Sequence, residues 1–184
     1  MRTVPAPRAP GRYSVALVCL GNICRSPMAD VVLAQRVDEA GLSGRVRVVS
    51  SGTGDWHVGK PIDRRAAAAL LAGGYDPSAH RARQFAASWV DDHDLVLAMD
   101  AQNLADIRAL ADRIDGVDPE RVRLYRDYDP GGTGGEVPDP YYGGDAGFEE
   151  VLAMVERTSA AIVAALQSLT HTPAWTPDGP PAGR

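Results

Sequence analysis

Residues 15–28 constrain the fold of this chain more than any other stretch. The apolar run 15–18 is typical of a central parallel strand that is covered on both faces, and Cys19 follows it directly. A few residues later, Ser26 is predicted as a helix N-cap and Pro27 as the first helical residue. The segment therefore predicts a strand, a loop and a helix in direct succession.

The loop after Cys19 has the composition of an anion-binding site. Its backbone amides can converge below a helix N-terminus, where Gly21 allows close approach and Asn22 tolerates a left-handed conformation. Such surroundings favour the thiolate form of Cys19, and the guanidinium of Arg25 can bind two phosphate oxygens at once. We interpret the loop as a phosphate-binding cradle with Cys19 as its nucleophile. The other residues expected around the phosphate are Leu20, Gly21, Asn22, Ile23, Cys24 and Ser26.

The alternative is an inert Cys19, since a cysteine in an apolar strand is usually a small buried hydrophobe. A Cys-x5-Arg spacing alone also occurs by chance. Its place between a strand and a helix, with Gly21 and Asn22 inside it, favours the catalytic interpretation. A Walker-type phosphate loop is excluded because the G-x4-G-K-[ST] pattern is missing.

Two motifs resemble those of the low-molecular-weight protein tyrosine phosphatases. They are Cys19-Leu20-Gly21-Asn22-Ile23-Cys24-Arg25-Ser26-Pro27 and, near the other end, Asp139-Pro140-Tyr141-Tyr142-Gly143. The resemblance extends from about residue 13 to about residue 169. It implies a hydrolase that forms a phosphocysteine intermediate on Cys19, with Arg25 binding the phosphate oxygens. The resemblance also implies that this hydrolase needs no cofactor and no metal.

A general acid is expected because the leaving oxygen of a phosphate ester departs as an anion unless it is protonated. Asp139 is the candidate, held between Pro138 and Pro140, which keep it out of helices and sheets. An aspartate in such a turn is usually structural, and the resemblance is what assigns it the role of acid.

Aromatic residues are expected to select the substrate. By the resemblance, Trp56 and Tyr142 wall the substrate cleft, Tyr141 lies nearby, and His57 belongs to the same loop as Trp56. A deep aromatic slot admits a phenyl phosphate and leaves the shorter phosphoserine out of reach. Ile23 indicates phosphotyrosine, since the arginine-phosphatase branch of the family carries threonine at that position.

Further residues are expected to support the loop. By the resemblance, Ser51 and His80 hold the strained Asn22, and the Ser26 hydroxyl bonds to the sulfur of Cys19. Taken alone, His80 would be interpreted as an exposed loop residue. Cys24 is either an ordinary loop residue or a redox guard that forms a reversible disulfide with Cys19.

The rest of the chain predicts a single α/β domain over residues 13–170. Apolar runs that alternate with helical periodicities imply a four-stranded parallel sheet with helices on both faces. In such sheets ligands bind beyond the carboxyl ends of the strands, where the Cys19 loop would lie. Strands are expected at 14–18, 46–49, 94–98 and 121–125, and helices at 27–41, from Asp63 to 73, from Asp100 to 114, and at 147–169.

Length and composition limit the remaining possibilities. With 184 residues, the chain has room for one core but not for two ordinary domains. Residues 1–12 are predicted to be a disordered leader and residues 171–184 a disordered proline-rich tail. The formal net charge of −5 disfavours nucleic acid as a partner. No apolar run approaches the ~20 residues that cross a bilayer, so no membrane association is expected.

The sequence thus predicts a metal-independent protein tyrosine phosphatase. Its expected partners are tyrosine-phosphorylated proteins, with inorganic phosphate as a product inhibitor, and it should be a monomer or a weak dimer. The cytoplasm is the expected location, while export without a signal peptide stays open. Arsenate reductase of the same fold is an alternative, disfavoured because no cysteine follows Cys24 to form an internal relay. A catalytically silent phosphotyrosine-binding module is the other.

Overall fold

The computed structural model describes residues 2–132, 134–172 and 175, and within them the chain forms one parallel α/β sheet. Its strands are β1 (Tyr13–Cys19), β2 (Val46–Gly52), β3 (Leu95–Ala98) and β4 (Val122–Leu124). They lie in the order β2-β1-β3-β4, and every adjacent pair is parallel. The predicted four-stranded parallel sheet is therefore confirmed, with β1 near its centre.

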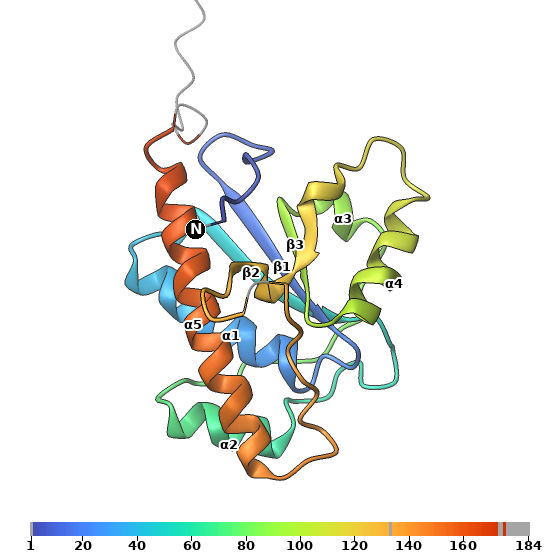
Figure 1. The fold of residues 1–184 in the computed structure, drawn as a ribbon, viewed down its shortest axis with the longest axis vertical. Coiled ribbons are helices and arrows are strands. Elements are labelled where there is room, and N and C mark those ends of the chain that lie inside the picture. Colours follow the sequence, from blue (N-terminus) through green and yellow to red (C-terminus); the bar gives the residue numbers. More distant parts are fainter. Residues whose placement is uncertain (1, 133, 173–174, 176–184) are drawn as a thin grey trace, which may run out of the picture.

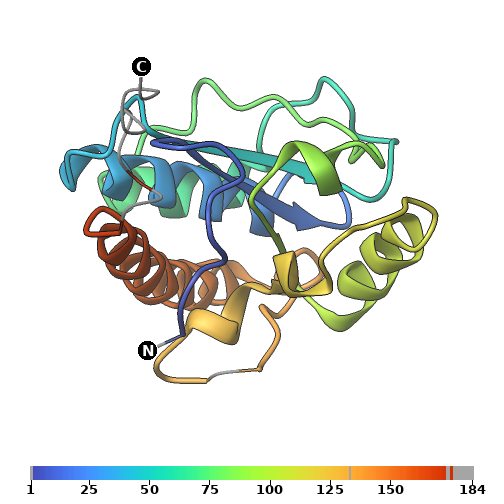
Figure 2. The ribbon, with the colours of Figure 1, turned by 90° about the horizontal axis from the view of Figure 1, so that it is seen from above.

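Helices cover both faces of this sheet (Figures 1 and 2). On one side lie α1 (Arg25–Glu39), α2 (Arg64–Ala72) and α5 (Asp145–Leu169), and on the other α3 (Trp89–Asp92) and α4 (Ala101–Ala111). Two short 3-10 turns, Pro119–Arg121 and Tyr125–Tyr128, flank β4.

The side chains of β1 alternate between two cores. Val15, Leu17 and Cys19 pack in the larger core with α1, α2 and α5, whereas Ala16 and Val18 pack in the smaller core with α4. Every one of these side chains is at most 3% exposed. Burial on both faces is the reason why β1 is apolar throughout, as its sequence predicted.

The start of α1 differs from the prediction. The helix begins at Arg25, its N-cap is Cys24, and the Cys24 side chain makes no capping hydrogen bond. Ser26 and Pro27 therefore lie inside the first turn, and the assignment of Ser26 as the N-cap is wrong. The physical reason is that the loop already closes into helical bonding before Ser26, with the amide of Met28 donating to the Cys24 carbonyl at 3.1 Å.

Two other predicted caps are confirmed. The Asp63 carboxylate accepts from the Arg65 amide at 2.8 Å at the start of α2. The Asp100 carboxylate accepts from the Asn103 amide at 2.7 Å at the start of α4.

The N-terminal residues are ordered against the domain, contrary to the predicted disordered leader. Val4 is 7% exposed and belongs to the larger core. The Arg8 amide donates to Asp94 at 2.6 Å, and the Arg8 guanidinium donates to the carbonyls of Val90 and His93. These partners lie more than eighty residues away along the chain, so local periodicity could not reveal them.

Part of the predicted disordered tail is also packed. Trp175 is 2% exposed, its ring lies 5.0 Å from the Arg45 guanidinium, and its carbonyl accepts from Arg45 at 2.9 Å. Residues 171–172 form a turn after α5, where the Thr172 amide donates to the Leu169 carbonyl at 2.8 Å. The rest of that prediction falls on residues 173–174 and 176–184, outside the described residues.

One described helix, α5, is long and apolar enough to span a membrane by length and composition. The prediction that no apolar stretch approaches this length is therefore wrong for α5. Val151, Val155, Ile162 and Leu166 of α5 are fully buried in the larger core. Core packing is thus a sufficient reason for its apolar character.

Candidate active site

The loop between β1 and α1 lies at the carboxyl edge of the sheet. β1 ends at Cys19, and α1 begins at Arg25. The loop is tied to its neighbour by amides of Thr53 and Gly54, which donate to the carbonyls of Cys19 and Leu20 at 2.9 Å. The segment after β2 thus holds the cradle from one side.

Asn22 organises the interior of the loop. It has a φ of 54°, so the predicted left-handed conformation is confirmed. Its amide donates to the sulfur of Cys19 at 3.2 Å, and its side-chain Nδ2 donates to the Ser26 hydroxyl at 2.9 Å. Its Oδ1 accepts from the Arg83 amide at 2.9 Å. The buried Asn22 therefore fixes the loop from several sides at once.

His80 holds Asn22 from outside the loop. Its Nε2 lies 2.8 Å from the Asn22 carbonyl, and because a carbonyl only accepts, Nε2 carries the hydrogen. Burial lowers the pKa of His80 below its usual value, although the bond to Asn22 acts in the opposite direction. A neutral imidazole with a defined tautomer is the result.

The Ser26 hydroxyl lies between three groups. It is 3.0 Å from the sulfur of Cys19 and 3.2 Å from the Ser51 carbonyl, and it accepts from Asn22. Because a hydroxyl has one hydrogen, it can donate to the sulfur or to the carbonyl but not to both. Ser51 supports the loop through its backbone carbonyl, which contacts Ser26 and not Asn22 as expected. Its own hydroxyl is buried and has no hydrogen-bond partner among the described residues.

The guanidinium of Arg25 is buried and paired. It is 4% exposed, and its Nη1 lies 2.6 Å from Asp100 while its Nη2 lies 2.8 Å from Asp139. Nη1 also donates to the Val137 carbonyl at 3.3 Å. Burial alone would lower the pKa of Arg25, but Cys19, Asp100 and Asp139 outweigh it and raise the pKa. Arg25 is therefore a permanent positive charge beside Cys19.

Asp139 reaches the site from the other end of the chain. Its Oδ2 pairs with Arg25, and its Oδ1 accepts from the Tyr141 amide at 3.1 Å. The carboxylate is 38% exposed, so it lies at the border between the pocket and solvent.

These groups line one pocket of about 310 Å³. Its walls hold most of the residues predicted for the phosphate and the substrate: Cys19, Leu20, Gly21, Ile23, Cys24, Arg25, Trp56, His57, Asp139, Tyr141 and Tyr142. The exposed aromatic rings of Trp56 and Tyr142 are 60% and 93% accessible and stand at the mouth. Asn22, Ser26, Ser51 and His80 lie behind the wall as its support.

Cys24 is a free, buried thiol, and Cys19 is free as well. Burial, followed by the nearby Asp63 carboxylate, raises the pKa of Cys24 well above its usual value. A reversible disulfide between the two cysteines stays a prediction.

Three residues that contact the site or its surroundings were not predicted in that place from the sequence. Asp100 was predicted only as a helix cap, and neither Arg83 nor Arg65 was considered. A signal existed for Asp100, since a carboxylate just after a central strand lies at the ligand-binding edge of a parallel sheet. Among the described residues, no group of three His, Cys, Asp or Glu side chains is arranged as a metal site.

The fold and this site define an α/β protein with a Cys-x5-Arg loop between its first strand and its first helix. The chain belongs to the low molecular weight phosphotyrosine protein phosphatase family, whose sequence profile matches residues 14–171.

Individual relatives agree with this membership. The chain is 50% identical over 157 residues to a low molecular weight protein-tyrosine-phosphatase of Streptomyces coelicolor, covering 84% of this chain and 94% of that protein. It is 47% identical over 144 residues to low molecular weight protein-tyrosine phosphatase A of Mycobacterium tuberculosis, covering 77% and 84%.

Solved structures agree in fold. A protein tyrosine phosphatase from Entamoeba histolytica, crystallised with Hepes in its active site, superposes with a TM-score of 0.78 at 30% identity. That match covers 85% of this chain and 97% of the other. YfkJ from Bacillus subtilis gives a TM-score of 0.77 at 34% identity, covering 85% and 96%.

Proposed function

We propose that this protein is a protein tyrosine phosphatase that works through a phosphocysteine intermediate on Cys19. One observation carries the proposal. The sulfur of Cys19, the guanidinium of Arg25 and the carboxylate of Asp139 meet in one pocket whose mouth is aromatic. These are a nucleophile, an anion-binding group and a proton donor, which together suffice to cleave a phosphate monoester.

In the first step the Cys19 thiolate attacks phosphorus, an S–P bond forms, and the bond from phosphorus to the phenolic oxygen breaks. The Asn22 amide donates to the sulfur and stabilises its negative charge. Arg25 and the loop amides hold the equatorial oxygens, so positioning and charge stabilisation need no metal ion. Asp139 gives its proton to the departing phenolate.

In the second step water attacks the phosphocysteine, and Asp139 accepts its proton. The P–S bond breaks, and Cys19 leaves as a thiolate. The single hydrogen of Ser26 can then turn from the Ser51 carbonyl to the sulfur. Such a bond makes the sulfur a better leaving group.

The ion pair between Arg25 and Asp139 suggests how substrate binding prepares the acid. Their 2.8 Å contact occupies Nη2, one of the nitrogens that a phosphate would bind. A phosphate dianion competes with the carboxylate for this nitrogen. Asp139 is then released at the mouth of the pocket, where the leaving oxygen lies.

Phosphotyrosine is the substrate that the walls favour. Trp56 and Tyr142 stand above the cradle and can enclose an aromatic ring, while Ile23 lines the pocket beside the thiol. A phosphoserine side chain is too short to carry its phosphorus through this aromatic mouth. We therefore propose tyrosine-phosphorylated proteins as substrates and inorganic phosphate as a competing product.

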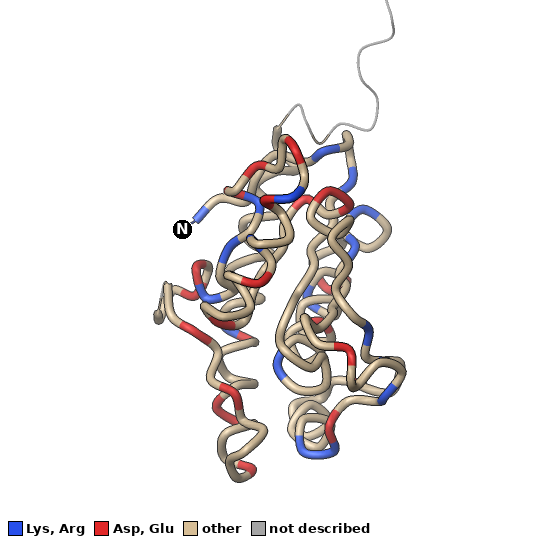
Figure 3. Tube along the Cα trace, turned by 90° about the vertical axis from the view of Figure 1, so that its right-hand side faces the viewer, with Lys and Arg blue, Asp and Glu red and all other residues tan. Residues whose placement is uncertain are grey.

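We also propose a reducing compartment, the cytoplasm, as the place of action, because the mechanism requires Cys19 as a free thiol. Nucleic acid is a poor fit as a partner, since the net charge is −5 and acidic and basic residues are interspersed along the trace (Figure 3). A monomer or weak dimer and the absence of membrane association stay predictions.

A phosphatase assay tests the proposal. Cys19→Ser should abolish turnover of p-nitrophenyl phosphate, and rapid acid quenching of the wild type should trap phosphate on Cys19. Asp139→Asn should lower turnover, whereas Asp145→Asn, an exposed acid at the start of α5, is the matched control and should not. Turnover by Cys19→Ser would refute the proposal, and phosphate binding without any turnover by the wild type would favour the silent binding module.

A further inference from the structure

Arg65 lies beside the active site and contacts the loop that carries Asp139. We call residues 139–144 the acid loop. The Nη1 atom of Arg65 donates to the Gly143 carbonyl at 3.3 Å, and its guanidinium lies 5.5 Å from the centre of the Tyr141 ring. The same guanidinium lies 4.7 Å from the ring centre of Phe148 on α5. One side chain of α2 thus touches both the acid loop and the helix that follows it.

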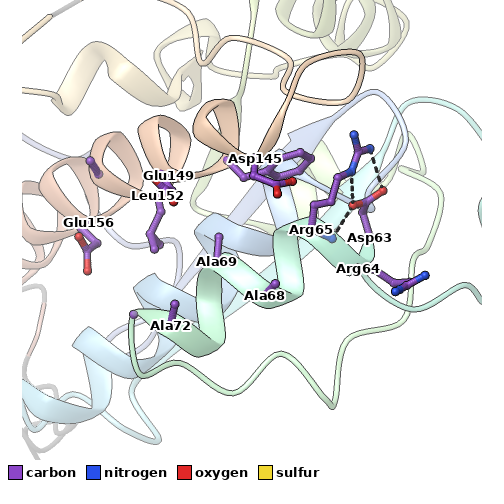
Figure 4. A pocket seen from close by; sticks show the side chains of 13 residues that line it. Asp63, Arg64, Arg65, Ala68, Ala69, Ala72, Asp145, Glu149, Leu152 and Glu156 are labelled. Atoms are coloured by element: carbon purple, nitrogen blue, oxygen red, sulfur yellow. Dashed lines mark hydrogen bonds and ion pairs between the residues drawn. The ribbon is translucent and has the colours of Figure 1, made fainter.

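Asp63 fixes the direction of this arginine. Nε and Nη2 of Arg65 lie 3.1 Å and 3.2 Å from the two oxygens of Asp63, a fork-to-fork pair that Figure 4 shows at the end of the groove between α2 and α5. Two hydrogen bonds in one plane restrict the guanidinium far more than a single contact does.

Asp63 is in turn bound to the phosphate-binding cradle. Its amide donates to the Ile23 carbonyl at 2.8 Å, and its carboxylate also caps α2. A continuous path of contacts therefore leads from the cradle through Asp63 and Arg65 to the acid loop. No part of this path uses a group that would bind the phosphate through its side chain.

The path through Arg65 matters because the proposed mechanism breaks the ion pair between Arg25 and Asp139 when the substrate binds. In the free protein Asp139 is held by Arg25, whose Nη2 is needed for the phosphate oxygens. When a phosphate binds Nη2 of Arg25, the contacts of Arg65 with Tyr141 and with the Gly143 carbonyl can remain, because they lie outside the phosphate site. The acid must stay within hydrogen-bond reach of the leaving oxygen at that moment.

We propose that Arg65 is a positioning residue that holds the acid loop, and with it Asp139, over the leaving oxygen. The inference rests on the proposed function and assigns to it a residue outside the pocket wall. Arg65 touches neither the phosphate nor the reacting atoms, and it acts through Asp139.

The dependence of rate on the leaving group tests this role. Phenolate is a much stronger base than p-nitrophenolate, so phenyl phosphate depends on the general acid far more. We expect Arg65→Ala to lower kcat/KM at least about tenfold for phenyl phosphate and less than about threefold for p-nitrophenyl phosphate, since general acids contribute roughly 100-fold to 10,000-fold. Arg65→Lys should show a smaller effect in the same direction, because lysine keeps a charge without the fork.

Arg64→Ala is the matched control, because Arg64 is the adjacent, exposed arginine of α2 and its side chain makes no hydrogen bond or ion pair among the described residues. It should leave both rates unchanged. Inhibition of Arg65→Ala by inorganic phosphate should stay within about twofold of the wild type, which shows an intact cradle and a folded protein.

A double-mutant cycle distinguishes positioning from a general structural effect. In an Asp139→Asn background, adding Arg65→Ala should cause no further loss on phenyl phosphate, because the acid is already absent. The proposal would be overturned if Arg65→Ala lowered kcat/KM equally on phenyl phosphate and p-nitrophenyl phosphate. It would also be overturned if Arg65→Ala lowered kcat/KM as much in the Asp139→Asn background as in the wild type. If Asp139→Asn itself shows no leaving-group dependence, the assignment of the acid is wrong and the role of Arg65 falls with it. If Arg65→Ala leaves both rates unchanged while Asp139→Asn lowers the rate on phenyl phosphate more than that on p-nitrophenyl phosphate, only the role proposed for Arg65 is refuted.

Discussion

The carboxylate of Asp100 lies 2.6 Å from Nη1 of Arg25 and at the same time accepts a hydrogen bond from the Asn103 amide in the first turn of α4. Arg25 follows β1, and Asp100 follows β3, the neighbouring parallel strand. Asp100, which follows β3, thus holds the anion-binding side chain of Arg25, which follows β1. Asp100 does not line the pocket, and its contact with the site is made through Arg25.

Asp100→Asn should weaken phosphate binding without unfolding the protein. Asparagine caps a helix as well as aspartate does, so α4 should persist, while the charged hydrogen bond to Arg25 is lost. Hydrogen bonds to charged groups contribute roughly 1.5–3 kcal/mol, so we expect kcat/KM to fall on the order of tenfold to 100-fold. Steady-state kinetics and the inhibition constant of inorganic phosphate measure this. Unchanged values for both would show that Arg25 needs no such support.

Two substitutions of Asn22 separate its backbone from its side chain. Asn22→Gly keeps the left-handed backbone and loses the side-chain bonds to Ser26 and Arg83, whereas Asn22→Ala loses the bonds and also strains the backbone. A left-handed residue other than glycine costs roughly 1–2 kcal/mol, so Asn22→Ala should be the less stable variant by about 1 kcal/mol. Urea unfolding of both variants checks the order. Equal stabilities would mean that the side-chain bonds alone carry the effect.

Ser26→Ala should slow the second step more than the first. Without the hydroxyl 3.0 Å from the sulfur, the phosphocysteine has a poorer leaving group. We expect kcat to fall about tenfold and kcat/KM much less, with a larger burst of p-nitrophenol before the steady state. Stopped-flow measurements on p-nitrophenyl phosphate record the burst. A parallel loss in kcat and kcat/KM would instead assign the hydroxyl to formation of the intermediate.

The two cysteines should differ in reactivity. Burial and the Asp63 carboxylate raise the pKa of Cys24, so at neutral pH it stays a thiol and reacts slowly. Brief treatment with iodoacetate should therefore modify Cys19 and spare Cys24, and inorganic phosphate should protect Cys19. Peptide mapping by mass spectrometry gives the extent at each site. Preferential alkylation of Cys24 would contradict the assignment of the nucleophile.

His93 should make the fold sensitive to acid. Burial, aided by Arg47, lowers the pKa of His93 to about 4, although Asp92 and Asp94 act against this. Because the unfolded chain takes up the proton near pH 6.5, the stability that neutral His93 contributes is complete above that pH and is lost as the pH falls toward 4. We expect a loss of about 2 kcal/mol between pH 7.5 and 5. Urea unfolding should show a smaller loss for His93→Gln, and equal slopes for both proteins would exclude His93 as the cause.

The sequence by itself determined the sheet and the cradle. The apolar runs of β1 and β3, the residue types from Cys19 to Arg25, and the carboxylates at Asp63 and Asp100 are local signals. Apolar patterning, backbone conformation and capping can each be predicted from residues that are close together in the chain. The same locality misplaced the start of α1, where the Ser26 hydroxyl is engaged by Cys19 and Asn22 instead of a helix amide.

Only the tertiary structure decided which charges meet. The partners of Arg25 lie 75 and 114 residues away, those of Arg8 more than eighty, and Arg65 reaches Gly143 across 78 residues. No periodicity encodes such pairs, since they form where separate strands end at one edge of the sheet and where α2 packs on α5. The order of the strands and the packing of the helices therefore built the site from residues whose types the sequence had already supplied.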